Sequence, residues 1–355
     1  MSILKVDAIR HNSATSDAIT TASDGTCTAR LTSIGGGGLS HRNLVVNGAM
    51  LISQRGTSFS GTAQQYTLDR MQTNTVGNDE IAQTEQASVT SGGAYTSGFR
   101  KCMKIINGNQ TSGAGAGDIV HLKMVLEAQD IANSGWNYTS SSSYITLSFW
   151  VKSSVAQNFY GRLRSKTGTS LNYPFETGSL SADTWTYITK KIPGNSNITI
   201  TDDNGTGMEV EFMLFRGTDQ TGSVSLDTWA AYSGSTRCPD FTSTWYTTND
   251  ATFEVTGFQL EVGEHATPFE HRSFAEDLRR CQRYFQRLPV SSDHVMWGFG
   301  RAESNSARVQ VPLSVPLRAS PTVTCSNNRS VKYDATMVSS TSTPTVFKWD
   351  DDFAS

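Results

Sequence analysis

Apolar and polar residues alternate with a period of two in several stretches of residues 43–270, and this alternation constrains the fold more than any other feature. Successive side chains of a β-strand point to opposite faces, so each stretch predicts a strand with one apolar face. In "SYITLSFWVKSS" and "TGMEVEFMLFRG", the residues expected on the apolar faces are Ile145, Leu147, Phe149, Val151, Met208, Val210, Phe212 and Leu214. Several such strands between turn clusters favour an antiparallel β-sandwich over a parallel sheet. The chain is therefore expected to be mainly β.

The stretch "TFEVTGFQLEV" keeps this alternation but changes its parity at Gly257. Phe253 occupies an odd position and belongs to the first apolar set. Phe258, Leu260 and Val262 occupy even positions and form the second set. A one-residue slip would turn half of these side chains outward, whereas a β-bulge at the glycine would absorb the extra residue. We predict one bulged strand over residues 252–262, buried at both ends.

A helix is predicted directly behind that strand, in "SFAEDLRRCQRYFQRL". Ser273 can cap it, and Glu276 follows three residues later, as in a capping box. The apolar residues are spaced 4-3-4-3 and comprise Phe274, Leu278, Cys281, Phe285 and Leu288. Such a stripe either packs on the chain's own sandwich or forms a seam where copies of the helix meet around an axis. We assign residues 271–290 to this connecting helix.

Smaller β-regions are predicted on both sides of the sandwich. Residues 1–42 form a polar, β-capable arm that ends in four consecutive glycines, which predict a flexible hinge. The arm is too short to hold a core of its own, so it is either a disordered tail or a segment that docks on another chain. Residues 291–355 alternate again, but prolines restrict their strands to edges. The expected domains are therefore 1–42, 43–270, 271–290 and 291–355.

Composition excludes several classes of partner. Charged residues make up 17% of the 355 residues and the net charge is −3, which does not suggest a surface for nucleic acid. No run approaches the roughly 18 apolar residues of a membrane span, and "MSILKVDAIRHNS" is not expected to act as a secretory signal. The five cysteines are dispersed, without a CxxC pair, and indicate free thiols in a reducing cytosol.

Several passages together resemble tail fibre proteins of bacteriophages, especially those of marine phages. They are "NLVVNGAMLISQRGTSFSGTAQQYTLDRM", "LSFWVKSS", "TWTYITKKIPG" and, most specifically, "GFQLEVGEHATPFEHRSFAEDLRRCQRYFQ". The resemblance implies a carbohydrate-binding-module-like jelly roll, a short helix and a small C-terminal β-domain in a homotrimeric fibre. It implies a virion component, assembled in the host cytoplasm and exposed outside. The partners would be a tail adaptor, nozzle or baseplate protein and a host cell-surface glycan, with no membrane insertion.

The resemblance also assigns roles to particular residues. The opening "SILKVDAIRHNS" is similar to an attachment arm, and its tail-docking candidates are Ile3, Leu4, Val6 and Ile9. Jelly rolls of this kind often hold calcium through acidic residues that follow an Asn-Gly pair near the start of the domain. Here Asn47 and Gly48 are followed by Ala49 and Met50, without a carboxylate. Neither a metal nor a cofactor is therefore expected.

Glycan binding needs exposed aromatic faces with polar groups beside them. The aromatic residues in loop-like sequence, which we take as candidates for glycan contact, are Trp136, Tyr138, Trp229, Tyr232, Trp245 and Tyr246. For each of them taken alone, ordinary loop packing is the favoured explanation. Phe149, Phe212 and Phe258 are expected in the core, and Trp185 is a further core candidate.

No constellation supports catalysis, so the protein is not expected to be an enzyme. A glycoside hydrolase needs two nearby carboxylates. Glu209 and Glu211 share one strand face, but a solvated outer face explains them as well. The histidines lack HExxH spacing and no GxSxG motif occurs. The alternatives to a tail fibre are a polysaccharide-depolymerising tail spike and a cellular carbohydrate-binding or adhesive module.

Overall fold

The computed structural model describes a central body and several short segments on either side of it. The described residues are 6–10, 12–13, 15–24, 27–29, 41–60, 64–287, 299–303, 306–310, 313–322, 329–333 and 336–340. The predictions for Ile3, Leu4 and Leu288 therefore lie outside the described residues. The main body is formed by residues 41–60 and 64–287.

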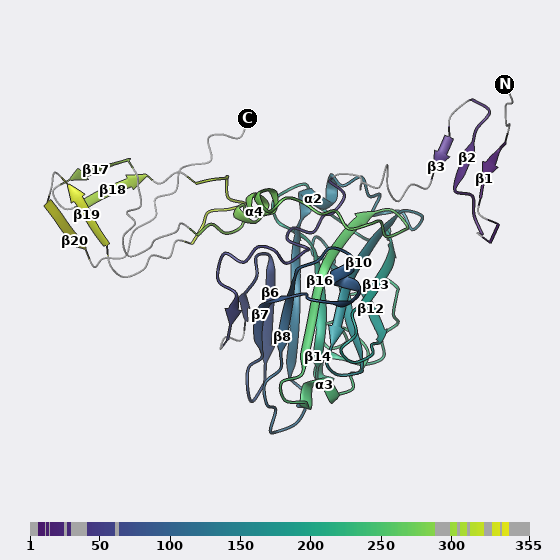
Figure 1. Cartoon of the computed structure of the whole chain (residues 1–355), viewed down its shortest axis with the longest axis horizontal. Coiled ribbons are helices and arrows are strands. Elements are labelled where there is room, and N and C mark those ends of the chain that lie inside the picture. Colours follow the sequence, from purple (N-terminus) through teal and green to yellow (C-terminus); the bar gives the residue numbers. More distant parts are fainter. Residues whose placement is uncertain are drawn as a thin grey trace.

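Two antiparallel sheets pack face to face in this body (Figure 1). The strands of the six-stranded sheet are β4 (Ser58–Phe59), β7 (Gln83–Ser88), β8 (Lys101–Ile106), β10 (Tyr144–Ser153), β13 (Thr186–Pro193) and β16 (Thr252–Val262). Those of the seven-stranded sheet are β5 (Gln64–Tyr66), β6 (Met71–Val76), β9 (Ile119–Glu127), β11 (Asn158–Ser165), β12 (Leu171–Ser179), β14 (Thr206–Arg216) and β15 (Ala230–Ala231). Their orders are β13-β10-β16-β8-β7-β4 and β15-β12-β11-β14-β9-β6-β5. The predicted mainly-β sandwich is confirmed.

The core lies between the sheets and centres on three phenylalanines. The ring centroids of Phe149 and Phe212 are 4.7 Å apart, and those of Phe212 and Phe258 are 4.8 Å apart. All eight residues expected on the apolar faces of β10 and β14 are buried. The alternation of the sequence therefore identified the core faces correctly, because a strand between two layers must turn its apolar side inward.

β16 contains the predicted bulge. Ser148 of β10 pairs with Gln259, but Trp150 pairs with Thr256, so two residues of β16 lie opposite one of β10. Gly257 occupies the bulge with a φ of 68°, a left-handed conformation that favours glycine. Phe253 and Phe258 are both buried in the same core, which confirms the prediction. Burial at both ends was wrong, since Val262 is 40% exposed.

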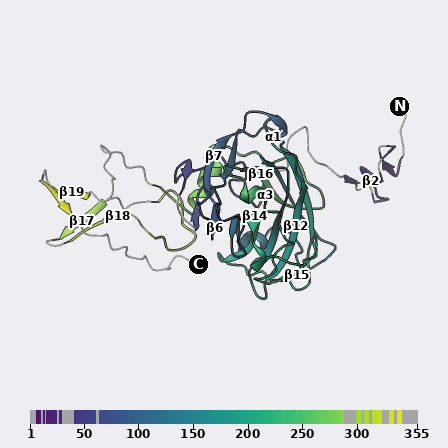
Figure 2. The ribbon, with the colours of Figure 1, turned by 90° about the horizontal axis from the view of Figure 1, so that it is seen from below.

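Short helices close the ends of the sandwich (Figure 1). α2 (Ala128–Ala132) and α4 (Phe274–Gln282) lie at one end and α3 (Thr244–Thr247) lies at the other. α1 (Gly92–Thr96) lies outside the sandwich, on the side opposite β15 (Figure 2), and η1 (Thr218–Gln220) is a single 3₁₀ turn. Within the described residues, none of these helices has the length and apolarity needed to cross a bilayer.

Small sheets occur in both flanking regions. Before the body, β1 (Ala8–Ile9), β2 (Ile19–Thr21) and β3 (Cys27–Ala29) form one three-stranded sheet. After the body there are two hairpins, β17 (Phe299–Glu303) with β18 (Ser306–Gln310) and β19 (Arg329–Tyr333) with β20 (Thr336–Ser340). These elements agree with β-structure on both sides, and the domain boundaries stay a prediction.

α4 begins as predicted but ends early. The Ser273 hydroxyl accepts a hydrogen bond from the Glu276 backbone N–H at 3.2 Å, which caps the helix. The helix ends at Gln282, and the two aromatic residues that follow bind arginines of the body. The Arg70 guanidinium lies 3.4 Å from the Tyr284 ring centroid, and that of Arg55 lies 3.7 Å from the Phe285 ring centroid. These cation–π contacts attach the chain to the sandwich where a longer helix was expected.

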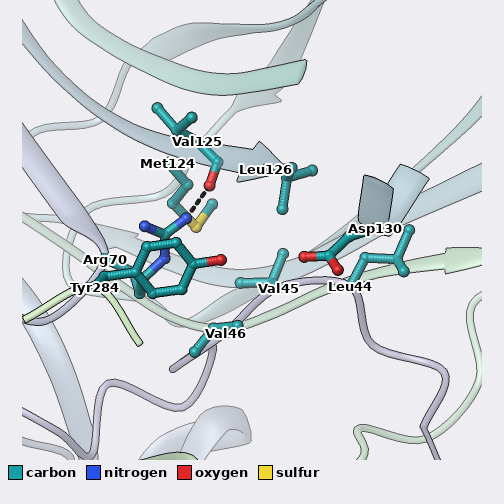
Figure 3. Close-up of a pocket in the computed structure, with 9 residues that line it drawn as sticks. All are labelled: Leu44, Val45, Val46, Arg70, Met124, Val125, Leu126, Asp130 and Tyr284. Atoms are coloured by element: carbon teal, nitrogen blue, oxygen red, sulfur yellow. Dashed lines mark hydrogen bonds between the residues drawn. The ribbon is translucent and has the colours of Figure 1, made fainter. Parts of the chain in front are cut away.

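Figure 3 shows the attachment around Arg70. The guanidinium donates to the Val125 backbone oxygen and stacks on Tyr284. Beside it, Arg283 Nε and Nη2 each donate to a Glu127 carboxylate oxygen at 2.9 Å. The enclosed space that the residues of Figure 3 line is about 10 Å³, room for a single water molecule. This place therefore fixes the end of α4 and holds no ligand of saccharide size.

The apolar stripe of α4 is divided between two environments. Cys281 is fully buried against its own sandwich, and Phe285 packs under Arg55. Leu278 is half-buried, whereas Phe274 is 60% exposed. The C-terminal part of the stripe thus packs on its own domain, and the N-terminal part leaves a side chain open for another copy. Whether chains meet there stays a prediction.

Candidate functional site

Three of the six aromatic residues predicted to contact glycan are buried in the core. Trp136, Trp245 and Tyr246 are at most 3% exposed. The Trp245 indole N–H donates to the Thr252 oxygen at 3.1 Å, and the Tyr246 ring stacks on Phe215 at 4.2 Å. Because α3 closes one end of the sandwich, it turns these large side chains inward. Their ring faces are not offered to a ligand, and packing accounts for all three.

The other three predicted residues are half-buried and do not come together. The Trp229 indole donates to the Pro193 oxygen at 2.7 Å, and its ring lies 5.3 Å from that of Tyr173. Tyr138 packs edge-on against Trp136. Tyr232 lies on the outer face of the seven-stranded sheet, under a guanidinium of Arg164 at 3.5 Å. The six side chains therefore do not form one platform.

A different set of aromatic residues gathers on the outer face of the six-stranded sheet. Trp150 of β10 and Tyr187 of β13 are direct cross-strand partners, and their ring centroids are 5.1 Å apart. Trp185 directly precedes β13 and packs in the same outer cluster as Trp150. Trp150 and Trp185 are half-buried, and Tyr187 is 43% exposed. We call these three side chains the aromatic platform.

A groove of about 230 Å³ opens beside this platform. Its residues come from three places: the end of β7 with the start of α1, the turn before β13, and the outward faces of β10 and β16. One wall is residues 88–93 and the other is residues 183–185. Gly92 and Gly93 let the backbone of α1 approach the indoles, since a Cβ on Gly93 would lie 2.4 Å from Trp150 Cη2. The helix thus supports one side of Trp150 and leaves Tyr187 open.

A charged pair lies at the base of the groove. The Lys152 ammonium is 3.0 Å from the Glu254 carboxylate, its cross-strand partner, and 5.2 Å from the Trp185 ring centroid. The Cys102 thiol lies 3.6 Å from the other Glu254 oxygen, and burial raises the pKa of that thiol. Cys102 is therefore held as an unreactive thiol. The groove offers aromatic faces, an ammonium and a carboxylate within one short stretch of sheet.

The sequence carried a signal for this platform. Trp150 stands on the polar side of the alternation in "SYITLSFWVKSS", and Trp185 and Tyr187 share one parity in "DTWTYITKK". Aromatic rings on the solvent side of two strands indicate a platform only when those strands are neighbours. Which strands are neighbours is decided by the tertiary structure and cannot be read from the periodicity of one strand. Trp185, expected in the core, packs instead against a small outer cluster that includes Val89 and Ala94.

The two glutamates expected on a solvated face are buried, which corrects that prediction. Glu209 is 6% exposed and Glu211 is 1% exposed. Glu211 accepts hydrogen bonds from Arg162 and Arg216. Burial alone would raise the pKa of Glu211, but the guanidinium groups of Arg162 and Arg216 hold it well below its usual range. The strand face is polar as predicted, but Arg162, Arg164 and Arg216 lie over its two glutamates.

Within the described residues, no group of three or more His, Cys, Asp and Glu side chains is placed to hold a metal ion. The side chain of Asn47, the first residue of the Asn-Gly pair, makes its hydrogen bonds with the backbone. Its amide donates to the Ile52 and Asp69 oxygens, both at 2.9 Å, and its oxygen accepts from the Ile52 N–H at 2.9 Å. This asparagine therefore fixes a turn.

The sequence matches no protein-family model and no curated protein. Similar solved structures include tailspike protein 4 of bacteriophage CBA120, an enzymatically active domain, at 9% identity and a TM-score of 0.33. That match covers 66% of this chain and 24% of the other, so the chain corresponds to about a quarter of the tailspike structure. The N-terminal cellulose-binding domain of Cellulomonas fimi β-1,4-glucanase C is similar at 9% identity and a TM-score of 0.28, over 55% of this chain and 89% of that one.

A further similar structure is the family 11 carbohydrate-binding module of Clostridium thermocellum, bound to a mixed-linked tetrasaccharide. It shares 13% identity at a TM-score of 0.23, over 62% of this chain and 95% of that module. At such identities and TM-scores the likeness says nothing about function. What this chain binds has to be argued from its own residues. Its own strand order describes a two-sheet antiparallel β-sandwich with a bulged strand in the six-stranded sheet.

Proposed function

We propose that this protein is a carbohydrate-binding β-sandwich, and that a saccharide lies across its groove and the adjacent aromatic platform, against Trp185 of the groove wall and Tyr187 beside it. The observation that carries the proposal is the aromatic platform beside the Lys152–Glu254 pair. The C–H faces of a sugar ring pack on aromatic rings, and sugar hydroxyls both donate and accept hydrogen bonds. An ammonium and a carboxylate 3.0 Å apart supply both kinds of partner at one place.

A test of this proposal is binding of a panel of immobilised glycans by the intact protein and by two point variants. Tyr187→Ala should weaken binding of a recognised glycan by about tenfold, since one stacking ring contributes on the order of 1 kcal/mol or more. Tyr66→Ala is the matched control, because Tyr66 has the same 43% exposure but lies on β5 at the edge of the other sheet. Equal binding by the two variants would rule out the groove as the site.

We propose further that the chain binds its saccharide without cleaving it. A glycoside hydrolase needs a carboxylic acid with a raised pKa beside a second carboxylate. Glu254 at the groove is paired with Lys152, and the pKa of Glu211 is held well below its usual range. Incubation with a bound polysaccharide should therefore release no reducing ends. Release that stops in Glu254→Gln would overturn this proposal and favour the depolymerising tail spike.

We also propose that this binding serves host recognition by a phage tail fibre, a homotrimer located in the virion. The support is the resemblance of "GFQLEVGEHATPFEHRSFAEDLRRCQRYFQ", the passage that forms β16 and α4. In the arm, Val6 and Ile9 are 40% and 53% exposed, as docking side chains would be. Light scattering should give a trimer, and deletion of residues 1–42 should abolish attachment to tail particles while the trimer remains. A folded monomer would contradict the fibre proposal.

A further inference from the structure

The outer face of the seven-stranded sheet, opposite the groove, carries a dense group of charges. Six basic residues of β9, β11, β14 and the adjoining segments contribute: Lys123, Arg162, Arg164, Lys166, Arg216 and Arg237. In the described part of the chain, the carboxylates that these side chains contact are Glu209 and Glu211. Burial lowers the pKa of the neighbouring His121 to about 3, so that ring is neutral at physiological pH. We call this group the basic patch.

The inner part of the basic patch is buried and incompletely paired. Glu211 accepts from Arg162 Nε at 2.9 Å, from Arg162 Nη2 and from Arg216 Nη2. The side chains of Arg162 and Arg216 are 3% and 0% exposed. Arg164 Nε and Arg216 Nε are nevertheless buried donors without an acceptor in the described part of the protein. Such donors are uncommon in folded proteins, because each forfeits the hydrogen bond that it could make.

The outer part of the basic patch is partly exposed to solvent. Three cations share one carboxylate, with Lys123, Arg164 and Lys166 nitrogens 3.4, 3.7 and 3.8 Å from Glu209 oxygens. Their side chains are 22%, 16% and 29% exposed. One carboxylate cannot neutralise three cations, and each cation has hydrogen-bond donors left for a ligand. An anion arriving from solvent would meet all three.

The surroundings of Tyr232 show the same excess of positive charge. Its ring lies 3.5 Å from the Arg164 guanidinium carbon, 5.1 Å from that of Arg162 and 5.8 Å from that of Arg237. Burial by itself would raise the pKa of the Tyr232 hydroxyl, but Arg237 and Arg162 outweigh it and the pKa is lowered. The pKa of Arg237 is also lowered, by burial and then by Arg216. Added negative charge would be favourable here.

From this arrangement we infer that the basic patch is an oxyanion-binding site, which takes a carboxylate or sulfate group of an acidic saccharide. Six basic residues against two glutamates leave an excess of four positive charges on a chain whose net charge is −3. Planar guanidinium groups and ammonium groups are the side chains that bind such oxyanions. The identification of the oxyanion as part of a saccharide rests on the proposed function. The oxyanion site itself does not depend on that proposal.

The test is a titration of intact protein labelled with ¹⁵N-arginine, followed by NMR of the Nε–Hε groups. Sodium sulfate and sodium glucuronate are the two anionic probes and glucose is the uncharged one, all at one ionic strength set with sodium chloride. Either anion should shift the Arg164 signal saturably, and glucose should not. The Arg164 signal is assigned by its loss in Arg164→Gln.

Point variants test whether the anion binds at the basic patch. Arg164→Gln should weaken anion binding by about tenfold, since it removes a charge-assisted hydrogen bond. Arg100→Gln is the matched control, because Arg100 also stacks on a tyrosine, with its guanidinium carbon 3.9 Å from the Tyr95 ring centroid. It should leave binding unchanged. Tyr187→Ala should also leave anion binding unchanged. The proposal of glycan binding at the groove and the inference of anion binding at the basic patch can therefore be refuted separately.

Three results would overturn the inference. One is the absence of a saturable shift with both anions, which would leave water as the partner of the buried donors. Another is equal weakening by Arg164→Gln and Arg100→Gln, which would indicate screening over the whole surface. The third is a shift of the same size with glucose. A response to one anion only would support the site and tell a carboxylate from a sulfate ligand.

Discussion

Trp150 and Tyr187 face each other across β10 and β13 with their ring centroids 5.1 Å apart. The pair lies on the outer face of the sheet, the face that commonly carries polar side chains in antiparallel sheets. α1 covers part of Trp150, and the tyrosine is left 43% exposed. The two rings therefore have different roles. The half-buried Trp150 indole fixes the position of the platform, and the exposed Tyr187 ring is available to a ligand.

Substitution of the two rings should separate stability from binding. Trp150→Ala should lower the free energy of unfolding by about 2–3 kcal/mol, since it removes a large half-buried ring from the outer cluster. Tyr187→Ala should change it by less than about 1 kcal/mol while glycan binding weakens by about tenfold. Urea denaturation of both variants measures this difference. Equal destabilisation would show that Tyr187 is a packing residue.

The bulge in β16 should tolerate no side chain at Gly257. A Cβ there would lie 2.6 Å from Phe99 Cζ, and the φ of 68° is unfavourable for other residues. Gly257→Ala should cost about 2–4 kcal/mol of stability. Gly178→Ala is the control, since Gly178 has a φ of 72° but open space around it. It should cost only about 1 kcal/mol, and the difference between the two variants measures the contact with Phe99.

Removal of the charge of Glu211 should be far more costly than removal of a surface charge. Glu211→Gln leaves two buried guanidinium groups without their counter-ion and should destabilise the fold by about 3–5 kcal/mol. Glu85→Gln breaks a more exposed pair, 4.0 Å from Lys104, and should cost less than about 1 kcal/mol. Thermal unfolding of both variants measures this. A similar, small loss in both would mean that water already screens the buried cluster.

The same cluster should make the fold sensitive to acid. Burial lowers the pKa of His121 to about 3 in the folded protein, whereas an unfolded histidine titrates near 6.5. Between these values the unfolded chain binds a proton that the folded chain does not, so stability falls as the pH falls. The limiting slope is about 1.4 kcal/mol per pH unit. His121→Gln should flatten the stability curve in that window, and His41→Gln, at an exposed site, should not.

Substitutions in α4 should show which part of its apolar stripe contributes to trimer formation. Phe274 is 60% exposed, so Phe274→Ser should leave the unfolding transition unchanged and reduce trimer formation if chains meet there. Cys281 is fully buried, so Cys281→Ser should instead lower stability by about 1–3 kcal/mol. Light scattering and thermal unfolding distinguish the two effects. A trimer that survives Phe274→Ser would move the interface away from this helix.

Local patterns predicted most of the fold. The apolar faces of β10 and β14, the bulge at Gly257 and the cap at Ser273 are all present where the sequence indicated them. Each of these depends on contacts between neighbouring residues or on the period of a single strand. Such information is contained in a short stretch of chain, and for that reason no knowledge of the remaining fold was needed.

The candidate site was not predictable in the same way. Loop-like sequence suggested Trp245 as a surface residue, but the helix α3 turns it into the core. The polar side of β14 suggested a solvated Glu211, but arginines from β11 and from the end of β14 bury it. In both cases the outcome depends on what another part of the chain places over the residue. A single-strand pattern carries no such information.

The sequence by itself therefore determined which side of each strand is apolar, where the register of β16 shifts and where α4 begins, because these follow from side-chain alternation and from local hydrogen bonds. Only the tertiary structure decided which rings remain open to solvent and which charges meet. β10 and β13 become neighbours through long-range pairing, and that pairing brings Trp150 to Tyr187. A binding surface is made by residues distant in sequence, so its composition depends on strand order and on the loops that cover each face.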